Sequence, residues 1–488
     1  MFAKIYFLYI FAKQTKHQLI YIQLIMFKRE CYIKRREALR GLVRDGLILI
    51  FGNNESSYNY PSNVYKYRQD STFLYFFGQK RDGLVGIIDV DNNKEYLAGN
   101  DIDIDDIIWL GATPSVSDLA SEVGVENAIN INAMNQLVTK AKAEGRRIHF
   151  LPQYRHDIMI QISDLLGIHP LQTRAEASVE LIKAVVALRS KKEEVEIEEL
   201  EKAAAIGYKM HTTAMQLCRP GVTEQYIAGV IDGIASSYGS MVSFPTIMTM
   251  HGEIMHGIPT SAQLEEGRLM LCDAGAENNM NYCSDNTRTT PVSGRFTQQQ
   301  RAIYDTVVAC HDLAVDLARP GVTWKSVHLD ICRRLAEGLK DVGLMKGDLD
   351  EAVALGAHAL FLPHGLGHMM GLDVHDMEGL GQQYVGFDDE VQPSTQFGLN
   401  CLRMGRKLEK GFVLTDEPGC YFIPALIDQW KAEKKFTDFI NYDEVEKYRD
   451  FGGIRVENDL LITSEGCRII GQDIIPYHAD EVESFINE

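Results

Sequence analysis

HGLGHMMGLDVHD, residues 364–376, is the stretch that says most about the fold and the chemistry of this chain. Three histidines, His364, His368 and His375, stand within twelve residues, although the whole chain has only 14. Glycines separate the first two histidines, which argues against a helical pair of zinc ligands and for a backbone that approaches other groups closely. The stretch therefore predicts a non-helical segment at a functional site.

Four carboxylates interrupt segments that otherwise have the pattern of buried strands. Burying four carboxylates is very unfavourable without cations, because even one unpaired buried charge costs several kcal/mol. With one histidine they form a hard, oxygen-rich set that suits two divalent ions about 3.5 to 4 Å apart, Mn²⁺ by preference and Co²⁺ or Zn²⁺ otherwise. The acids are Asp273 in RLMLCDAG, Asp285 in NYCSDNTRTT, Glu417 in GFVLTDEPG and Glu457 in GGIRVENDLLIT.

The length and the net charge of the chain restrict the number of domains and the kinds of partner that we expect. The chain has 488 residues and a mass of 55.0 kDa, so two domains are expected. Lys and Arg number 49 against 68 Asp and Glu, and 49 − 68 = −19 disfavours nucleic acid and anionic membranes as partners. Nine scattered cysteines without a CxxC pair indicate reduced thiols and a cytoplasmic location.

The N-terminal residues resemble a signal peptide only weakly. An apolar run over residues 5–12 follows Lys4, but small residues for a cleavage site are missing, and Lys13 and Lys16 interrupt the pattern. Met26 stands just before a strongly helical stretch. We therefore expect Met26 to be the true start of the protein.

The first part of the chain has an α/β pattern. An amphipathic stretch predicts a helix over 31–43, and dense charge at helical spacing predicts a helix at a domain junction over 184–206. Apolar runs between them predict strands, so we expect an α/β N-terminal domain over residues 27–178. The predicted strands are 46–52, 72–77, 84–90 and 94–97.

The second part of the chain, residues 179–488, contains an internal repeat. The sequence RPGVT occurs at 219–223 and again at 319–323, each time between two helical patterns. Proline and glycine would end one helix and threonine would cap the next, so we expect two αβ halves related by a pseudo-two-fold axis. Short strands also recur in pairs, which predicts an α+β domain with antiparallel pairing, at 268–273, 282–289, 412–417 and 453–462.

These motifs resemble a known family from about residue 30 to the end. HGLGHMMGLDVHD, VLTDEPG and FGGIRVEND are similar to motifs of the proline-specific metallopeptidases with the pita-bread, or creatinase-like, fold, which comprise prolidase (Xaa-Pro dipeptidase) and aminopeptidase P (Xaa-Pro aminopeptidase). YRQDSTFLYFFG resembles their N-terminal domain. The resemblance implies an aminopeptidase P-like α/β domain over 27–178 and a dinuclear pita-bread catalytic domain over 179–488.

The resemblance also implies which ion each candidate ligand binds. Asp273 is expected to bind one ion, His368 and Glu417 the other, and Asp285 and Glu457 to bridge both. A hydroxide held between the ions would then attack the carbonyl of the bond between an N-terminal residue and proline. Glu417 would shuttle the proton to the leaving nitrogen.

Further residues are expected around the metals because of the same resemblance. His364 matches a catalytic histidine near the developing oxyanion, and His256 and His375 match histidines that line the substrate pocket and assist catalysis. Arg403 occupies the position at which prolidases hold the free carboxylate of a dipeptide. Arg455 lies two residues before Glu457 and is expected to orient that acid or to pair with it.

These features favour a prolidase acting on small peptides with proline in second position. The alternative within the family is aminopeptidase P, which acts on longer peptides, and a remote alternative is a non-catalytic peptide-binding module of the same fold. The intact ligand set argues against such a module and against creatinase. A methionine aminopeptidase usually lacks the N-terminal domain. Relatives suggest a homodimer or homotetramer.

Overall fold

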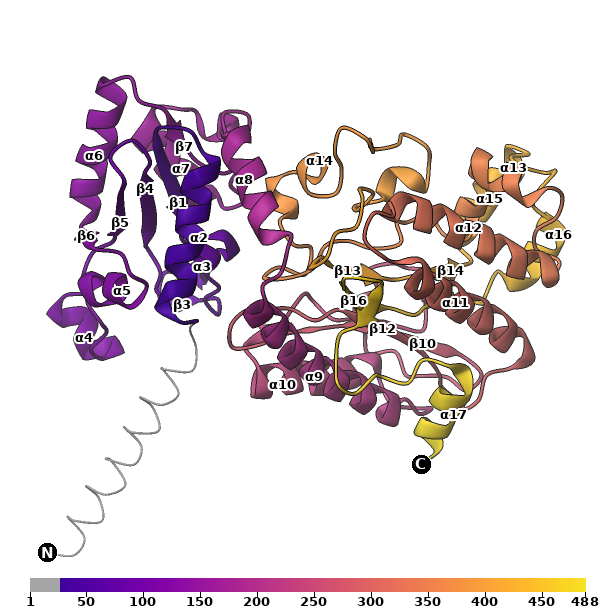
Figure 1. The fold of residues 1–488 in the computed structure, drawn as a ribbon. Coiled ribbons are helices and arrows are strands. Elements are labelled where there is room, and N and C mark those ends of the chain that lie inside the picture. The colour runs from indigo at the N-terminus through magenta and orange to yellow at the C-terminus, as the bar shows by residue number, and fades with distance from the viewer. Residues whose placement is uncertain (1–26) are drawn as a thin grey trace, which may run out of the picture. The chain divides into compact units, whose positions relative to one another are not determined.

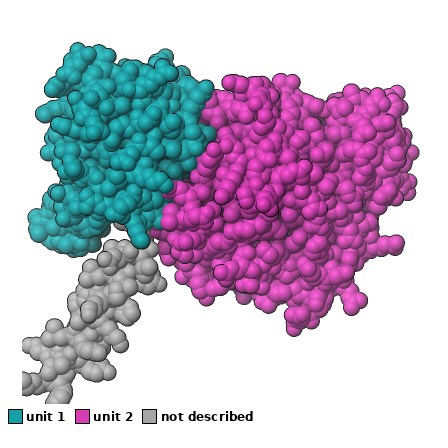
Figure 2. Space-filling model, viewed as in Figure 1, with its two compact units in different colours: residues 1–189 teal, residues 190–488 magenta. Residues whose placement is uncertain are grey.

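The computed structural model describes residues 27–488, which form two compact units (Figures 1 and 2). The predicted start at Met26 lies outside the described residues. The units divide between Arg189 and Ser190, so that helix α8 (Val179–Arg189) is grouped with the first unit. The domain limits of 27–178 and 179–488 stay a prediction. None of the described helices is long and apolar enough to cross a membrane.

The first unit is an α/β domain built on a five-stranded sheet in the order β6-β5-β4-β1-β7. β1 pairs antiparallel with β4 and parallel with β7. All residues of β1 and β4 are buried, as expected for strands with both faces covered. The strands are β1 (Leu47–Phe51), β2 (Ser57–Tyr60), β3 (Asn63–Val64), β4 (Val85–Asp89), β5 (Lys94–Ala98), β6 (Asn127–Ile129) and β7 (Ile148–His149).

The helices of this unit include α2 (Arg29–Leu42), which confirms the helix predicted over 31–43. The strands predicted at 46–52, 84–90 and 94–97 are confirmed as β1, β4 and β5. The other helical segments are α3 (Ser71–Phe77), α4 (Ile104–Leu110), α5 (Val116–Glu122), α6 (Ile131–Ala143), α7 (His156–Leu166) and the 3-10 turn η1 (Pro170–Gln172).

The strand predicted over 72–77 is wrong, because this segment is the helix α3. Its residues are all buried, and periodicity alone cannot separate a buried strand from a buried helix. The residues at the two ends of this segment identify it as a helix. The side chain of Asp70 accepts a hydrogen bond from the backbone N–H of Phe73, and Gly78 ends the helix at φ 62°.

The single helix predicted over 184–206 is also wrong. Helix α8 ends at Arg189, and a new helix, α9 (Glu194–Leu217), begins after Glu193. Glu193 and Glu196 form a reciprocal capping box, in which each side chain accepts a hydrogen bond from the backbone N–H of the other residue. The capping box at Glu193 thus starts a new helix within a stretch whose charge pattern is continuous in the sequence.

The internal repeat of the second unit corresponds to two helix pairs. α9 is followed by α10 (Glu224–Tyr238), and α11 (Gln298–Leu317) is followed by α12 (Trp324–Asp341). The predicted caps are confirmed, because the Thr223 side chain accepts from the N–H of Tyr226 and the Thr323 side chain from the N–H of Ser326. The glycines of both RPGVT sequences have positive φ, 84° and 89°, which only glycine adopts easily.

The strands of this unit lie between the two helix pairs (Figure 1). One sheet has the order β12-β10-β9 and another β13-β16-β17, and all their pairings are antiparallel, as predicted. A bridge between Thr287 and Glu457 joins the two halves. The strands are β8 (Met241–Val242), β9 (Ile247–Thr249), β10 (Leu269–Ala274), β11 (Ala276–Glu277), β12 (Asn286–Pro291), β13 (Val413–Asp416), β14 (Gly419–Tyr421), β15 (Gly453–Arg455), β16 (Asn458–Ile462) and β17 (Cys467–Ile469).

The remaining helical segments of the second unit are short and connect these layers. A 3-10 turn, η2 (Ala357–Leu360), leads into the histidine-rich segment at residue 364. The others are α13 (Leu349–Leu355), η3 (Glu378–Leu380), α14 (Gln382–Val385), η4 (Leu399–Cys401), α15 (Pro424–Ala432), α16 (Tyr442–Val445), η5 (Glu446–Tyr448) and α17 (Ala479–Asn487). The pita-bread architecture expected from the sequence, with mixed helix and strand content, is thus present.

Candidate metal centre and substrate site

The acids predicted as ligands lie on or beside the strands of both halves. Asp273 belongs to β10, and Asp285 immediately precedes β12. Glu417 follows β13, and Glu457 lies between β15 and β16. The two sheets meet at the bridge between Thr287 and Glu457, so the fold brings the segments that carry the four acids together.

The histidine-rich segment is fixed to β13 by backbone hydrogen bonds. The N–H of Thr415 donates to the carbonyl of His368, and the N–H of Glu417 donates to the carbonyl of Leu366, both at 2.9 Å. Gly367 lies so close to the Thr415 carbonyl that a Cβ would come within 1.9 Å of its oxygen. The close backbone approach expected from the glycines is therefore confirmed, and it brings His368 beside the acids.

His368 lies at the meeting point of the two halves. Its Nε2 is 3.4 Å from Oδ2 of Asp285 and 3.8 Å from Oε1 of Glu417. Asp285, His368 and Glu457 each offer a ligand atom within 4.8 Å of the other two. After burial, the negative charge of Asp273 is among the causes that raise the pKa of Asp285 and of Glu457, so Asp273 belongs to the same cluster.

The orientation of His368 suits a metal ligand. Its Nδ1 lies 3.1 Å from the carbonyl oxygen of Met369, so Nδ1 carries the proton and the lone pair of Nε2 faces the acids. Burial holds the pKa of His368 well below its usual value, with a contribution from His375. The imidazole is therefore neutral and available for coordination.

The charges of the cluster require cations. Burial first, and then the neighbouring carboxylates, raise the pKa of Asp285 and Glu457 well above their usual values. Burial also raises the pKa of Glu417 to about 7. Oδ1 of Asp273 and Oδ1 of Asp285 are buried without a hydrogen-bond partner among the described residues. Unpaired, hard oxygen donors of this kind fit divalent ions.

Arg455 compensates part of this charge, and it does so mainly through Asp273. Its Nη2 donates to Oδ2 of Asp273 at 2.7 Å, and its Nε donates to Oγ1 of Thr287 at 3.1 Å. The Thr287 hydroxyl in turn donates to Oε2 of Glu457 at 2.6 Å. Arg455 thus pairs with one acid and orients Glu457 through an intervening hydroxyl.

Tyr421 connects Arg455 to His364. Nη1 of Arg455 donates to the Tyr421 oxygen at 2.8 Å, and the same oxygen lies 2.8 Å from Nε2 of His364. Nδ1 of His364 is 2.8 Å from the carbonyl of Gly365 and carries the proton, so the tyrosine hydroxyl donates to Nε2. Burial lowers the pKa of His364 to about 3, which keeps this histidine neutral.

A second group of side chains lies beside His368. The ring centroids of His375 and His368 are 4.1 Å apart, and Nδ1 of His375 contacts Oε2 of Glu378. Nε of Arg403 is 3.4 Å from the same carboxylate, and the Arg403 side chain is 39 % exposed. Burial raises the pKa of Glu417, and the positive charge of Arg403 partly opposes that rise. The arginine is thus both near the acids and accessible to a ligand.

His256 and Asp416 lie at the margins of this site. His256 is exposed, and it is a neighbour of His364, whose pKa burial lowers. Asp416 is fully buried, and its Oδ2 is 3.7 Å from Nε2 of His311. Burial raises the pKa of Asp416 well above its usual value. Asp416 therefore faces the buried imidazole of His311.

The sequence matches two family descriptions. Residues 198–464 match metallopeptidase family M24, and residues 32–149 match the N-terminal domain of aminopeptidase P. The first match covers more than half of the chain. This chain belongs to metallopeptidase family M24.

Individual relatives of this M24 peptidase match nearly its whole length. The Xaa-Pro aminopeptidase of Escherichia coli K12 is 31% identical over 94% of this chain and 98% of the relative. The human Xaa-Pro dipeptidase is 28% identical over 91% and 89%. A zinc-substituted E. coli aminopeptidase P in complex with product superposes with a TM-score of 0.77 at 29% identity, over 95% and 99% of the two chains. Membership of this metallopeptidase family implies divalent metal ions.

Three side chains of the M24 site were not predicted from the sequence. Tyr421 stands in a strand, where a tyrosine usually has a packing role, and Thr287 stands in another strand. Glu378 follows HGLGHMMGLDVHD by two positions and could have been suspected from that proximity alone. The link that Tyr421 makes between His364 and Arg455 joins residues that are far apart in the sequence, so no local pattern indicates it.

Proposed function

We propose that this M24 peptidase is an Xaa-Pro dipeptidase, which hydrolyses the bond between an N-terminal residue and a C-terminal proline. The observation that carries this proposal is the position of Arg403. Its partly exposed guanidinium lies beside the His375–Glu378 pair and within electrostatic reach of Glu417 and His368. A forked guanidinium suits a free carboxylate, which a dipeptide presents immediately after the proline ring.

The same proposal includes two divalent ions, Mn²⁺ by preference, because the donors are mostly carboxylate oxygens. Asp273 would hold one ion and His368 and Glu417 the other, while Asp285 and Glu457 would contact both. When bound, the ions would supply a nucleophile at neutral pH and polarise the scissile carbonyl. The unpaired oxygens of Asp273 and Asp285 support this assignment.

The side chains of the protein itself would position the peptide and the proton. Glu417 is proposed to hold the proton that passes to the proline nitrogen, which has no N–H while it is part of the peptide bond. His364 is proposed to lie near the carbonyl oxygen, where Tyr421 fixes its ring. His375 and His256 are proposed to line the pocket for the substrate.

A second candidate function is aminopeptidase P activity on longer peptides. It is favoured by the E. coli Xaa-Pro aminopeptidase, which matches 98% of its own length, and by the superposition on E. coli aminopeptidase P. Arg403 would then have a role other than binding a terminal carboxylate. Both functions use peptides with proline in second position, and both would leave the metal centre unchanged.

The test uses purified protein that is stripped of metal and then given Mn²⁺. It is incubated with an Xaa-Pro dipeptide and, separately, with a longer peptide that has the same first two residues, and release of the first amino acid is followed. Cleavage of the dipeptide alone would support the dipeptidase. Cleavage of the longer peptide with equal or greater efficiency would favour aminopeptidase P. Failure on both substrates, with metal bound, would contradict the Xaa-Pro proposal.

A further inference from the structure

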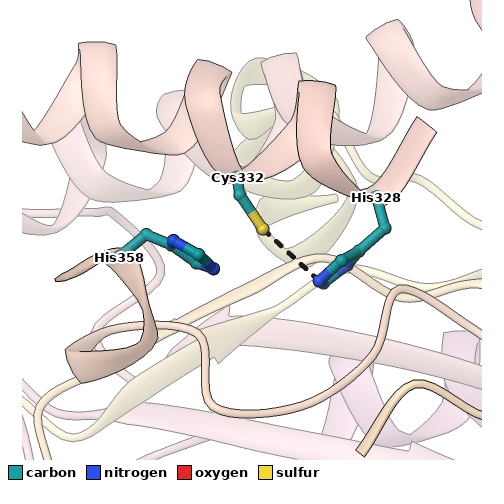
Figure 3. Close-up of side chains that lie close together, drawn as sticks. All are labelled: His328, Cys332 and His358. Atoms are coloured by element: carbon teal, nitrogen blue, oxygen red, sulfur yellow. Dashed lines mark hydrogen bonds between the residues drawn. The ribbon is translucent and has the colours of Figure 1, made fainter. Parts of the chain in front are cut away.

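A second cluster of potential metal ligands lies in the second unit, apart from the carboxylates (Figure 3). His328 and Cys332 are on α12 at a spacing of four residues, which places them on one face of the helix. His358 comes from η2, and Figure 3 shows its ring pointing toward the other two side chains. The cluster thus joins two elements that are separate in the sequence.

The geometry of this cluster is compact and dry. Sγ of Cys332 is 3.5 Å from Nε2 of His328, and one ligand atom from each of the three residues lies within 4.8 Å of the others. His328 is 1%, Cys332 0% and His358 2% exposed. Two imidazoles and a thiol therefore converge in an interior that solvent does not reach.

Packing alone accounts poorly for these residue types. Nδ1 of His358 and Nδ1 of His328 are buried without a hydrogen-bond partner among the described residues. Buried polar atoms nearly always have a partner, because leaving one unpaired is unfavourable. An apolar side chain at either position would avoid that cost. Nε2 of His328 faces Sγ of Cys332, a weak hydrogen-bonding group, and is the nitrogen that would bind a ligand. The convergence of the three side chains therefore carries the inference, and Nδ1 of His328 points away from the thiol.

The charges around the cluster indicate which ion it would take. Burial lowers the pKa of His328 to about 3, and among the described residues the further contributions come from the imidazoles of His358 and His364. Burial raises the pKa of the Cys332 thiol, with Cys310 as the neighbour that adds to it. No described carboxylate belongs to the cluster, and burial lowers the pKa of His358 to about 4.

Because no carboxylate belongs to the cluster, the charge of the ion decides whether the occupied site is neutral. One thiolate and two neutral imidazoles balance a single positive charge, so a monovalent ion leaves the buried site neutral. A divalent ion such as Zn²⁺ would leave one positive charge buried, which is unfavourable, and it would also call for a fourth ligand. Soft sulfur and imidazole donors suit Cu⁺.

We propose that His328, Cys332 and His358 form a second metal site that binds Cu⁺ in preference to Zn²⁺. Binding replaces the S–H bond of Cys332 by a Cu–S bond and releases one proton to the buffer, and no electron is transferred. The two imidazoles bind through lone pairs. The ion would connect α12 to η2, and η2 ends four residues before His364.

The experiment loads the metal-stripped, full-length protein with Cu⁺ without oxygen and measures affinity by competition with a coloured Cu⁺ chelator. We expect one tightly bound ion, with one sulfur and two nitrogen neighbours in its X-ray absorption spectrum. Cys332→Ser and His358→Gln should each weaken binding by about 100-fold or more. The absorption spectrum needs no variant, so it tests the site even if a substitution impairs folding.

Two control variants separate this site from other thiols. Cys310→Ser removes a buried thiol on α11 that donates to the carbonyl of Ile331 and is not part of the cluster. Cys401→Ser removes an exposed thiol that could bind Cu⁺ at the surface. Both should bind as the unchanged protein does. Equal binding by Cys332→Ser, a spectrum without nitrogen neighbours, or tighter binding of Zn²⁺ at these residues would each overturn the proposal.

Discussion

The second unit contains two buried clusters of potential metal ligands that differ in charge. The carboxylate centre combines Asp285 and its neighbouring acids with one histidine, and burial, followed by mutual repulsion, raises the pKa of Asp285 and Glu457. The His328–Cys332–His358 cluster has no acid, and burial keeps its imidazoles and its thiol neutral. Most of the acids are buried like the neutral cluster, although the Glu417 side chain is partly exposed. Charge therefore distinguishes the two clusters more than burial does.

This difference has a consequence for folding. Like charges in a dry interior repel strongly, so the carboxylate centre is expected to need either protons or metal ions. The neutral cluster can pack without any ion, and a metal there would add a cross-link to a structure that already exists. We therefore expect changes at the first cluster to affect catalysis most, and changes among neutral buried groups to affect stability modestly.

The largest expected effect comes from neutralising one acid of the carboxylate centre. Asp285→Asn keeps the size of the side chain but removes a negative charge next to His368. We expect hydrolysis of an Xaa-Pro dipeptide to fall by on the order of 10³-fold and the bound metal per chain to decrease. Both are measured on the same Mn²⁺-loaded samples.

The matched control for this change is Asp232→Asn, on α10. Asp232 is also partly buried and accepts a hydrogen bond from Thr246 at 2.6 Å, but it lies outside both clusters. Its substitution should leave activity within about two-fold, since it removes no ligand. If Asp285→Asn retained activity and metal content like the control, the carboxylate centre would not be the metal site.

The next effect tests whether residues around the centre select the substrate. Arg403→Ala should raise KM for an Xaa-Pro dipeptide by about 10- to 100-fold, because a charge-assisted hydrogen bond contributes roughly 1.5 to 3 kcal/mol. The change in kcat should be smaller. A longer peptide, whose carboxylate lies elsewhere, should be affected little. Steady-state kinetics on both substrates provide the measurement.

Lys407→Ala is the control for Arg403, because Lys407 is an exposed cation nearby in sequence that pairs with Glu390. It should change neither KM nor kcat appreciably. An equal loss with the dipeptide and the longer peptide in Arg403→Ala would mean that the arginine supports the pocket generally. The dipeptidase proposal would then lose the observation on which it rests.

A smaller effect is expected from the tyrosine that connects two parts of the site. Tyr421→Phe removes the hydroxyl between His364 and Arg455 and keeps the ring, which packs edge-on to His364 with centroids 5.3 Å apart. We expect kcat to fall about 10-fold with little change in KM, as for other residues that orient a catalytic group. A change confined to KM would instead place Tyr421 in substrate binding.

The sequence indicates the acids that the fold brings together more clearly than it indicates the residues around them, for a physical reason. A carboxylate in an apolar strand is costly, so Asp273 and Glu457 are conspicuous wherever they occur. Tyr421 is compatible with ordinary packing, and its role depends on partners 34 and 57 residues away. The segment 72–77 was assigned wrongly because an unbroken apolar run carries no periodicity, and a single cap at Asp70 decides it.

The neutral cluster shows the same limit of sequence analysis. The spacing of His328 and Cys332 on α12 is visible in the sequence, but His358 approaches them only through the fold. The repeated RPGVT, in contrast, predicted both helix pairs because its cap and turn residues act locally. The caps and turns were therefore predictable from local chemistry, whereas the approach of His358 to α12 was not.

The smallest expected effect concerns a buried imidazole outside both clusters, His211. It is fully buried, its Nε2 donates to the carbonyl of Ala274 at 2.9 Å, and burial lowers its pKa to about 4. In the unfolded chain a histidine has a pKa of about 6.5, so between about pH 6.5 and 4 only the unfolded state takes up the proton. The stability that neutral His211 permits is thus present above this window and is lost as the pH falls through it.

His211→Gln tests this expectation, because glutamine can donate to the same carbonyl and does not titrate. The free energy of unfolding is measured by urea titrations at several pH values and should fall on acidification in both proteins. The fall per pH unit should be smaller in the variant by up to about 1.4 kcal/mol. The carboxylates and bound metal titrate alike in both proteins, so the difference isolates the histidine. Parallel pH profiles would mean that His211 takes up a proton in the folded state as readily as in the unfolded state. The statement that burial keeps this imidazole neutral would then be wrong.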